Sequence, residues 1–340
     1  MSKRALITGI AGQDGSYLAE WLLDHDYEVY GLVRRVNTDS LMRLEHVKDR
    51  IHLLRGNMLD TSTIEQAIRT AHPHEIYNLA AQSHVGDSFD CPEETREINY
   101  FGLGRVVDEV LDFDSSIRVY QASTGEMFGS TPPPQHEGSA FEPVSPYGKA
   151  KLRAHQNFVE GYRTRHNLFI CSGFLFNHES PRRSKQFVTR KITHSMAKIE
   201  FGLQESFSLG NLDARRDWGY AGDYVQAMWL MLQRKKPEDY VLATGESHTV
   251  REFVEEVARV LGVSIRWEGN GAEEKGWCEQ LKRFIVSVDP EYYRPQEVHD
   301  LRGDAHKAHR DLGWHPTTKF QALVRMMALS DLELVSKKII

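Results

Sequence analysis

The chain has 340 residues, of which 10% are aromatic, and a formal charge of −6 from 42 basic and 48 acidic side chains. This length favours two lobes over one compact core, and the mildly acidic balance argues against a nucleic-acid or other polyanionic partner. No apolar run approaches the ~18 residues of a membrane span and no signal-peptide pattern is seen, so we expect no membrane association.

In the first half of the chain, short apolar segments alternate with helical patterns. We predict strands at residues 5–8, 28–33, 51–54, 76–80, 118–122 and 169–175, and helices at 17–23, 94–113 and from 147 onward. Strands that alternate with helices form a parallel sheet covered on both faces. The sequence therefore predicts an α/β fold built on a Rossmann-type, doubly wound parallel sheet.

The regular alternation ends after about residue 178. Helices predicted at 188–201, 223–233 and 249–261 lie among short strands and long loops, and no clean linker separates them. We therefore expect two interleaved lobes. Residues 1–178 form a dinucleotide-binding domain, to which about 206–245 are candidates to return, and residues 179–335 mainly form a smaller α/β substrate lobe.

The three cysteines, Cys91, Cys171 and Cys278, show neither a CxxC motif nor a metal-binding spacing. Cytosolic proteins keep such isolated thiols reduced. We therefore expect a cytoplasmic protein without disulfides and without a metal site.

A glycine-rich loop follows the first predicted strand and precedes the first helix. It reads Gly9-Ile10-Ala11-Gly12-Gln13-Asp14-Gly15. Backbone N–H groups and a helix N-terminus in this setting bind a pyrophosphate, and glycines let it approach the backbone. A tight strand–helix turn is the simpler explanation, but it does not need three glycines. The loop predicts a dinucleotide site.

The end of the second predicted strand indicates which dinucleotide binds. Folds that use NAD place an acidic residue there, whereas this strand ends with Val33-Arg34-Arg35. Guanidinium groups suit a 2′-phosphate, which favours NADP. The alternative is that both arginines are solvated loop charges. Ser40 and Arg43 are further candidates that the sequence does not decide between.

Two short motifs about twenty residues apart carry groups for redox chemistry. Ser123-Thr124-Gly125-Glu126 follows an apolar run, and Tyr147 and Lys151 form a Tyr-x-x-x-Lys pattern at the start of a helix. Tyrosine has a pKa of about 10, and a lysine one turn away together with an oxidised nicotinamide favours the phenolate. We expect Tyr147 to take a hydroxyl proton while hydride leaves, Lys151 to hold the nicotinamide ribose, and Thr124 to bond the same oxygen.

Glu126 distinguishes this set from that of a simple dehydrogenase. Once a neighbouring carbon is oxidised to a ketone, a carboxylate can remove the adjacent proton and help to expel a hydroxyl group as water. The alternative is that Glu126 caps the loop or forms an ion pair. The residues thus predict an oxidation followed by an elimination.

Longer stretches of the chain make a family resemblance visible. Besides the glycine loop, they are residues 77–85, 176–183, 187–191, 216–224 and 292–295. Over residues 3–327 the sequence resembles the GDP-mannose 4,6-dehydratases, a family of extended short-chain dehydrogenases/reductases. The resemblance implies oxidation of the mannose C4, loss of water across C5–C6, and return of the hydride to C6.

The resemblance also implies roles for matched positions. The catalytic set would be Thr124, Glu126, Tyr147 and Lys151. The NADP contacts would be Gly9, Ile10, Ala11, Gly12, Gln13, Asp14, Gly15, Arg34, Arg35, Asn57, Met58, Leu79, Ala80, Ala81, Gln82, Ser83, Tyr147, Lys151, His178 and Arg183. The contacts of the GDP-sugar would be Ser83, Asn177, Val188, Arg190, Lys191, Gly210, Arg215, Arg216, Arg294 and Glu297.

Two positions depart from the family pattern. Gly125 stands where the family usually has serine, so elimination is slower, another group substitutes, or the loop bends differently. Asn57 replaces an aspartate that faces the adenine, a minor change because an amide can donate and accept. A GDP-sugar epimerase or reductase and an inactive sugar-nucleotide binding protein remain alternatives, and the sugar is mannose or a related hexose or heptose.

The resemblance further implies a homo-oligomer, a dimer or a tetramer. The loop at residues 34–43 would reach the cofactor site of a neighbouring subunit. The predicted helices at 94–113 and 147–163 lie where this class of protein dimerises.

Overall fold

Seven parallel strands form the largest sheet of the structure, a computed structural model that describes residues 2–34, 41–292, 298 and 300–337. They are β1 (Arg4–Thr8), β2 (Glu28–Val33), β3 (Ile51–Arg55), β4 (Glu75–Asn78), β5 (Arg118–Thr124), β6 (Ile170–Leu175) and β11 (Tyr240–Leu242). Their order is β11-β6-β5-β4-β1-β2-β3. Every residue of β4 and β6 is buried, as expected where helices cover both faces. The predicted Rossmann-type α/β fold is confirmed.

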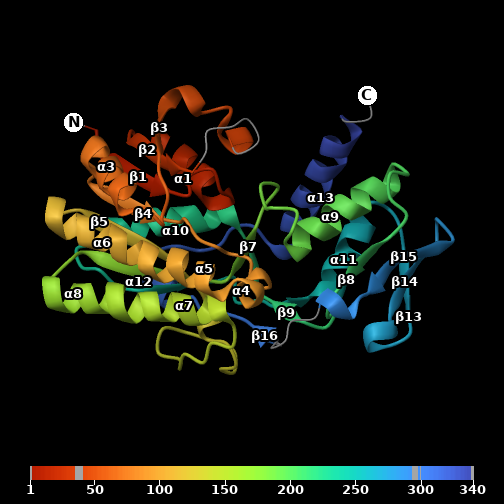
Figure 1. Cartoon of the computed structure of the whole chain (residues 1–340). Coiled ribbons are helices and arrows are strands. Elements are labelled where there is room, and N and C mark those ends of the chain that lie inside the picture. The colour runs from red at the N-terminus through yellow and green to blue at the C-terminus, as the bar shows by residue number, and fades with distance from the viewer. Residues whose placement is uncertain (1, 35–40, 293–297, 299, 338–340) are drawn as a thin grey trace.

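Helices cover both faces of this sheet (Figure 1). One core contains residues of α1 (Gln13–Leu23), α10 (Ala221–Gln233) and α12 (His306–Leu312), with Leu18 and Leu22 in the same cluster as Met228. The other contains residues of α3 (Thr61–Ala71) and α6 (Gly102–Phe113), including Ile68 and Val106. Each fully buried side chain of this kind contributes about 1.5–3 kcal/mol.

Two helical stretches are interrupted by π-helical turns. The helix predicted at 94–113 consists of α5 (Pro92–Arg96), a π-helical segment Glu97–Phe101 and α6. The helix predicted from 147 consists of α7 (Pro146–Ala154), a π-helical segment His155–Glu160 and α8 (Gly161–His166). Such single turns insert one residue into a helix and are frequent near functional sites.

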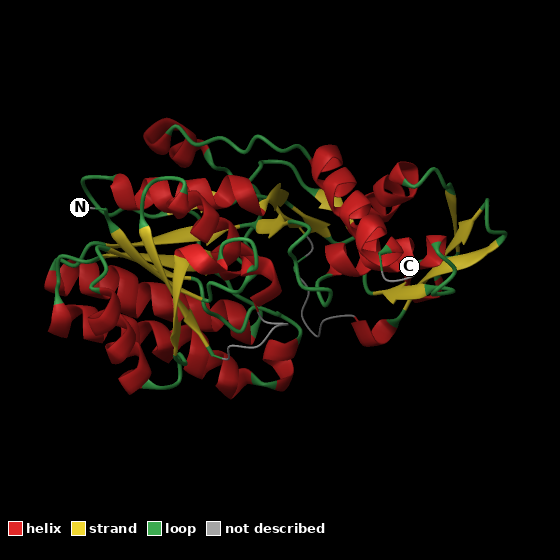
Figure 2. Cartoon of the chain, turned by 90° about the horizontal axis from the view of Figure 1, so that it is seen from above, coloured by secondary structure: helices red, strands yellow, loops and turns green. Residues whose placement is uncertain are grey.

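The smaller lobe combines three helices with a four-stranded sheet (Figure 2). Its helices are α9 (Val188–Glu200), α11 (Val250–Val260) and α13 (Phe320–Ser336); its strands are β8 (Phe207–Leu209), β13 (Ile265–Glu268), β14 (Lys275–Cys278) and β15 (Arg283–Val288). Trp218, Phe253 and Phe320 pack together in its core. A capping box of Thr249 and Glu252 begins α11.

Short strands connect the two lobes, and the chain crosses between them several times. β7 (Asn177–Glu179) pairs with β10 (Trp218–Tyr220), and β9 (Arg215–Arg216) lies between β12 (His248–Thr249) and β16 (Asp300–Leu301). Within the span 206–245, β8 belongs to the smaller sheet, whereas α10 and β11 lie on the large sheet. Segments that follow residue 178 in the sequence therefore belong to both lobes.

Several element ends differ from those predicted, and side-chain contacts explain one of them. β4 ends at Asn78 rather than at residue 80 because the Leu79 and Ala80 amides donate to Thr8 Oγ1. β5 continues to Thr124, so the strand itself carries the first residue of the predicted catalytic set. In the part of the chain that the structure describes, none of the helices combines the length and apolar character that a bilayer crossing requires.

Candidate active site

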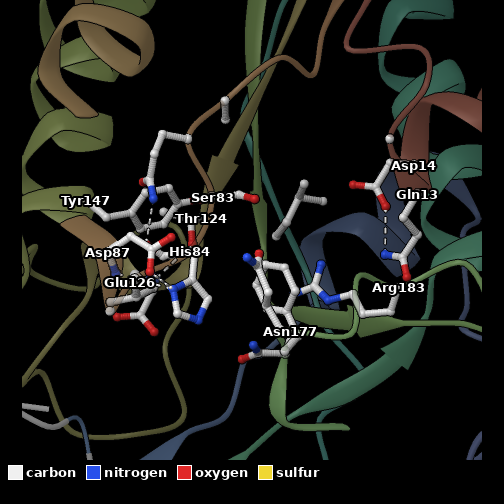
Figure 3. A pocket seen from close by; sticks show the side chains of 18 of the residues that line it. Gln13, Asp14, Ser83, His84, Asp87, Thr124, Glu126, Tyr147, Asn177 and Arg183 are labelled. Atoms are coloured by element: carbon white, nitrogen blue, oxygen red, sulfur yellow. Dashed lines mark hydrogen bonds and ion pairs between the residues drawn. The ribbon is translucent and has the colours of Figure 1, made fainter. Parts of the chain in front are cut away.

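A cavity of about 1700 Å³ opens at the carboxyl ends of the parallel strands and is lined by both lobes (Figure 3). β1 pairs with β2 on one side and with β4 on the other, so it marks the switch point where doubly wound folds bind ligands. A single small-molecule site usually occupies ~300–1,000 Å³. The cavity therefore has room for two ligands.

The glycine loop forms the cavity wall beyond β1. Gly9 has a φ of +72°, and a Cβ there would lie 2.9 Å from the Ala80 amide nitrogen. A Cβ on Gly15 would lie 2.4 Å from the Gly9 carbonyl oxygen, so the loop closes only with glycine. Gly12 begins α1 without a side-chain cap. The first amide groups of this 11-residue helix are therefore suited to an anion.

Six of the seven loop residues line the cavity, and Ile10 does not. Its side chain is fully buried against β2, where a Cβ on Gly31 would lie 2.5 Å from Ile10 Cδ1. The Ile10 side chain thus anchors the loop to the sheet, and only the backbone of this residue would meet a cofactor.

The ends of β2 and β3 bring polar groups to one side of the cavity. Arg34 is exposed there, and Asn57 and Met58 also line the wall. Arg43 lies beside the glycine loop, where its guanidinium donates to the Ala11 carbonyl at 3.3 Å. Arg35 and Ser40 fall outside the described residues.

The segment after β4 passes under the centre of the cavity. All five predicted residues line it: Leu79, Ala80, Ala81, Gln82 and Ser83. The Gln82 amide donates to Asn99 Oδ1 at 3.0 Å, and Asn99 Nδ2 donates back to the Gln82 carbonyl at 2.8 Å. This reciprocal pair holds the segment against the π-helical turn that precedes α6.

Thr124 and Glu126 lie where β5 ends and a 3₁₀ turn, Gly125–Met127, begins. Thr124 Oγ1 accepts a hydrogen bond from the Glu126 amide at 3.2 Å. Both side chains line the cavity and are nearly buried. Gly125 is not among the glycines with positive φ, so the loop does not use the conformation that its glycine would permit.

Tyr147 and Lys151 lie on one face of α7, which begins at Pro146 with Ser145 as its cap. The helix approaches the Glu126 backbone closely, since a Cβ on Gly148 would lie 2.7 Å from the Glu126 carbonyl oxygen. Both side chains line the same cavity as Glu126. Gly148, the residue after the tyrosine, therefore matters, because only glycine allows this approach.

Burial is the largest influence on the pKa values of Tyr147 and Lys151. It raises the pKa of Tyr147 to about 12, and the negative charge of Glu126 acts in the same direction, whereas a hydrogen bond with Thr124 acts against it. Burial lowers the pKa of Lys151 to about 8. Lys151 Nζ donates to the Ala122 carbonyl at 2.8 Å and lies 6.0 Å from the Tyr147 ring centroid. The chain's own groups thus favour the neutral phenol of Tyr147.

His178 and Arg183 face the glycine loop from β7 and the loop after it. His178 Nε2 lies 2.8 Å from Asp14 Oδ2, and Nδ1 lies 2.7 Å from the Phe176 carbonyl oxygen. Burial disfavours the imidazolium, but Asp14 more than compensates, so the pKa of His178 is raised and that of Asp14 is lowered. Both ring nitrogens are therefore engaged by the protein, and His178 orients the loop.

The predicted sugar-nucleotide contacts divide into three groups. Those that line the cavity are Ser83, Asn177, Val188, Lys191, Gly210 and Arg216. Arg294 and Glu297 fall outside the described residues. Arg190 and Arg215 lie elsewhere: Arg190 forms a buried ion pair with Asp331 at 2.6 Å, and Arg215 donates to the Ser247 carbonyl at 2.6 Å. Neither residue is among those that line the cavity, and their assignment to the substrate stays a prediction.

His84 and Asp87 also line the cavity, although no sequence pattern predicted a role for them. Figure 3 shows them beside Glu126, on the side that also holds Thr124 and Tyr147. Ser88, in the same turn, accepts a hydrogen bond from the Tyr147 amide at 3.3 Å. Only His84 fell within a motif, and nothing local indicated that the turn would meet α7.

A parallel sheet with a glycine loop at its switch point and a Tyr-x-x-x-Lys helix beside it defines a dinucleotide-binding protein of the short-chain dehydrogenase/reductase class. Solved structures of this class share the fold. A UDP-glucose 4-epimerase from Thermotoga maritima superposes with a TM-score of 0.81 at 20% identity, covering 99% of both chains. A dTDP-glucose 4,6-dehydratase from Streptomyces venezuelae, with NAD bound, gives 0.80 at 22% identity, covering 98% of both.

Sequence comparison identifies the family. The family model for GDP-mannose 4,6 dehydratase matches residues 6–327. GDP-mannose 4,6 dehydratase from Homo sapiens is 50% identical over 342 residues, which cover 97% of this chain and 92% of the human protein. The Drosophila melanogaster protein of that name is 49% identical, covering 98% and 87%. The chain belongs to the GDP-mannose 4,6-dehydratase family, which confirms the resemblance seen in the sequence.

Proposed function

We propose that this protein is an NADP-dependent GDP-mannose 4,6-dehydratase, which converts GDP-mannose into GDP-4-keto-6-deoxymannose and water. The observation that carries the proposal is that Thr124, Glu126, Tyr147 and Lys151 line one cavity together with the glycine loop. A base for a hydroxyl proton and a base for a carbon-bound proton thus face the same space. Membership of the family agrees with this chemistry.

The residues around the glycine loop fit a nicotinamide dinucleotide. Gly12 leaves the first turn of α1 open to a pyrophosphate, and the segment from Leu79 to Ser83 would flank the nicotinamide. Arg34, at the end of β2, would bind the 2′-phosphate of NADP, with the nearby Arg43 as a second cation. Held there, a nicotinamide would supply reversible hydride transfer, which the reaction needs at C4 and again at C6 of the sugar.

The chain's own residues would carry the protons. Tyr147 accepts the proton of the C4 hydroxyl while Thr124 holds the same oxygen. Because burial alone keeps Tyr147 neutral, the positive charges of Lys151 and of an oxidised nicotinamide are needed to favour the phenolate. Glu126 then removes the C5 proton, which the C4 ketone has made acidic, and returns it after water has left.

The GDP-sugar would lie toward the smaller lobe. Asn177, Lys191 and Arg216 line that part of the cavity, with Val188 and Gly210. Lysine and arginine suit the two phosphates of GDP. We therefore assign the cofactor mainly to the large-sheet lobe and the sugar nucleotide to the smaller one, with residues of about 206–245 contributing to both.

The test is incubation of the purified protein with GDP-mannose and analysis of the product by mass spectrometry. We expect the sugar nucleotide to lose one water without net consumption of added NADP or NADPH, since the hydride is returned. A product that keeps its 6-hydroxyl group would indicate an epimerase or a reductase instead. Tight binding of GDP-mannose without any turnover would indicate an inactive binding protein.

We also propose that the protein acts in the cytoplasm as a homo-oligomer. The aromatic residues Tyr100, Phe101 and Phe158 cluster where the two π-helical turns meet, and Phe101 is exposed. An exposed aromatic on a helix face suits a subunit contact. Light scattering of the purified protein tests this, and a monomer at micromolar concentration would contradict it.

A further inference from the structure

His84 and Asp87 form an ion pair in the cavity wall, in the turn that follows β4. His84 Nδ1 lies 2.6 Å from Asp87 Oδ1, and the two residues are three positions apart. The His84 side chain is 34% exposed, so it is accessible to solvent as well as to a ligand. The Phe187 ring meets it edge-on at 5.5 Å, which helps to fix its orientation.

This pair is attached to the predicted catalytic helix. Ser88 Oγ donates to the Val85 carbonyl at 2.6 Å and accepts from the Tyr147 amide at 3.3 Å. The turn that carries His84 is therefore anchored to the start of α7. Figure 3 shows His84 and Asp87 beside Glu126, on the same side of the cavity as Thr124 and Tyr147.

The ring of His84 uses one nitrogen for this pair. Nδ1 lies 2.6 Å from Asp87 Oδ1 and 3.2 Å from the Asp87 backbone amide nitrogen. Within residues 2–34, 41–292, 298 and 300–337, Nε2 has no hydrogen-bond partner. A carboxylate at Nδ1 fixes the orientation of an imidazole ring, and imidazole is a common general acid in active sites. Asp87 thus orients the ring so that Nε2 is the nitrogen available as a proton donor.

The elimination step needs such a donor. A hydroxyl group leaves readily only when it is protonated, and Glu126 is occupied with the C5 proton during the same step. Gly125 has no side chain with which to assist. Building on the proposed dehydratase function, we propose that His84, oriented by Asp87, is the general acid that protonates the departing C6 hydroxyl group.

The proton balance closes over one turnover. His84 gives its Nε2 proton to the C6 oxygen as the C6–O bond breaks, and water leaves. The proton that Glu126 took from C5 returns to C5 as hydride returns to C6. The proton of the C4 hydroxyl passes to solvent through Tyr147, and one proton from solvent restores His84. The net change is therefore loss of water alone.

The decisive experiment compares two leaving groups in His84→Gln and Asp87→Asn variants. GDP-mannose loses water, whereas its 6-deoxy-6-fluoro analogue loses fluoride, which departs without being protonated. For His84→Gln we expect water loss to fall by about 10²–10⁴-fold and fluoride release to stay close to that of the wild type. Asp87→Asn should show the same selectivity with a smaller loss.

Further measurements separate the role of His84 from that of Glu126. His84→Gln should still accumulate reduced nicotinamide and exchange the C5 proton with deuterated solvent, because Glu126 remains. His52→Gln, an exposed histidine on β3 away from the cavity, is the matched control and should behave as the wild type.

Two outcomes overturn the inference: undiminished water loss in His84→Gln, or an equal loss with both substrates, which would mean a purely structural role. Failure of the wild type to dehydrate GDP-mannose would instead refute the proposed function, before any variant is examined.

Discussion

At the scale of one residue, the buried charge of Lys151 lowers the stability of the folded protein. Burial lowers its pKa to about 8, so the folded state disfavours its charged form between pH 8 and the ordinary value of 10.5. In that range the unfolded chain binds more protons, so stability rises as pH increases. Below about pH 8 the full free-energy cost of burying the charged Lys151 is present, and this cost disappears above the ordinary pKa of lysine.

Lys151→Met should therefore be more stable than the wild type at pH 7, by up to about 3 kcal/mol, although inactive. The advantage should vanish as the pH rises above the ordinary pKa of 10.5, where the lysine becomes neutral in the unfolded chain as well. Urea unfolding at the two pH values measures it, with Lys151→Arg as the charged control. A methionine variant that is less stable at pH 7 would show that the bond to the Ala122 carbonyl outweighs burial.

Glu126 should be required for elimination but not for oxidation. In Glu126→Gln the C5 proton stays in place, so water loss should fall by about 10²–10⁴-fold while reduced nicotinamide accumulates. Absorbance of the reduced cofactor and product mass follow the two steps separately. Glu142→Gln, at an exposed residue bonded to Ser130, is the control. Full turnover by Glu126→Gln would refute the role of this carboxylate.

Gly125 lies against an aromatic ring, which makes restoration of the family serine costly. A Cβ at this position would lie 3.3 Å from three ring atoms of Phe176, a buried side chain. We expect Gly125→Ser and Gly125→Ala each to lower the free energy of unfolding by about 1–3 kcal/mol, measured in urea. If His84 is the acid, the serine hydroxyl adds nothing, and both variants lose water at the same rate. A serine variant about tenfold faster than the alanine variant, or about 1.4 kcal/mol in barrier, would contradict this.

At the scale of elements, the Asp14–His178 pair connects the first turn of α1 to β7. Gln13 strengthens the connection, since its side chain donates to the His178 carbonyl at 3.0 Å and accepts from Ser180 Oγ at 2.8 Å. Arg183 faces both charged groups, and the Tyr224 ring stacks on His178. The glycine loop is thus held in place by the strand that leads to the smaller lobe.

This pair should stabilise the protein over a defined pH window. The pKa of His178 is raised, so its contribution is complete below the usual value of 6.5 and is lost as pH rises through the raised value. The pKa of Asp14 is lowered, so its contribution is complete above the usual value of 3.8 and is lost as pH falls through the lowered value. A double-mutant cycle with Asp14→Asn and His178→Gln should give about 1–3 kcal/mol of coupling near pH 5.5. Undiminished coupling at pH 9 would contradict the assignment.

At the scale of the whole molecule, one cavity between two lobes makes the two ligands interdependent. Each ligand covers part of the space that the other faces, and each would hold the lobes in place. NADPH at about 100 times its Kd should stabilise the protein by about 2.7 kcal/mol, or roughly 5 °C in Tm. GDP should then raise the Tm further with NADPH present than without it. Strictly additive shifts in a thermal unfolding assay would contradict this coupling.

The order of elements in the first half was predictable because it depends on local patterns. β2 begins and ends at the residues predicted, and the glycine loop lies at the switch point. The family was also evident, since its motifs are continuous stretches of sequence. Which residues line the cavity was predicted well for the glycine loop and for the segment after β4, because parallel strands bring their carboxyl ends to one edge.

Long-range contacts decided what the sequence left open. Arg190, predicted to contact the sugar nucleotide, is held by Asp331, 141 residues away. β11 joins the large sheet although it lies in the sequence between β8 and α11, which both belong to the smaller lobe. The role that we propose for His84 depends on its turn meeting α7 through Ser88. Hydrophobic periodicity and motif spacing were therefore enough to predict the class of protein and its chemistry. The partner of each charged side chain depends on contacts between distant residues, which form only when the chain folds.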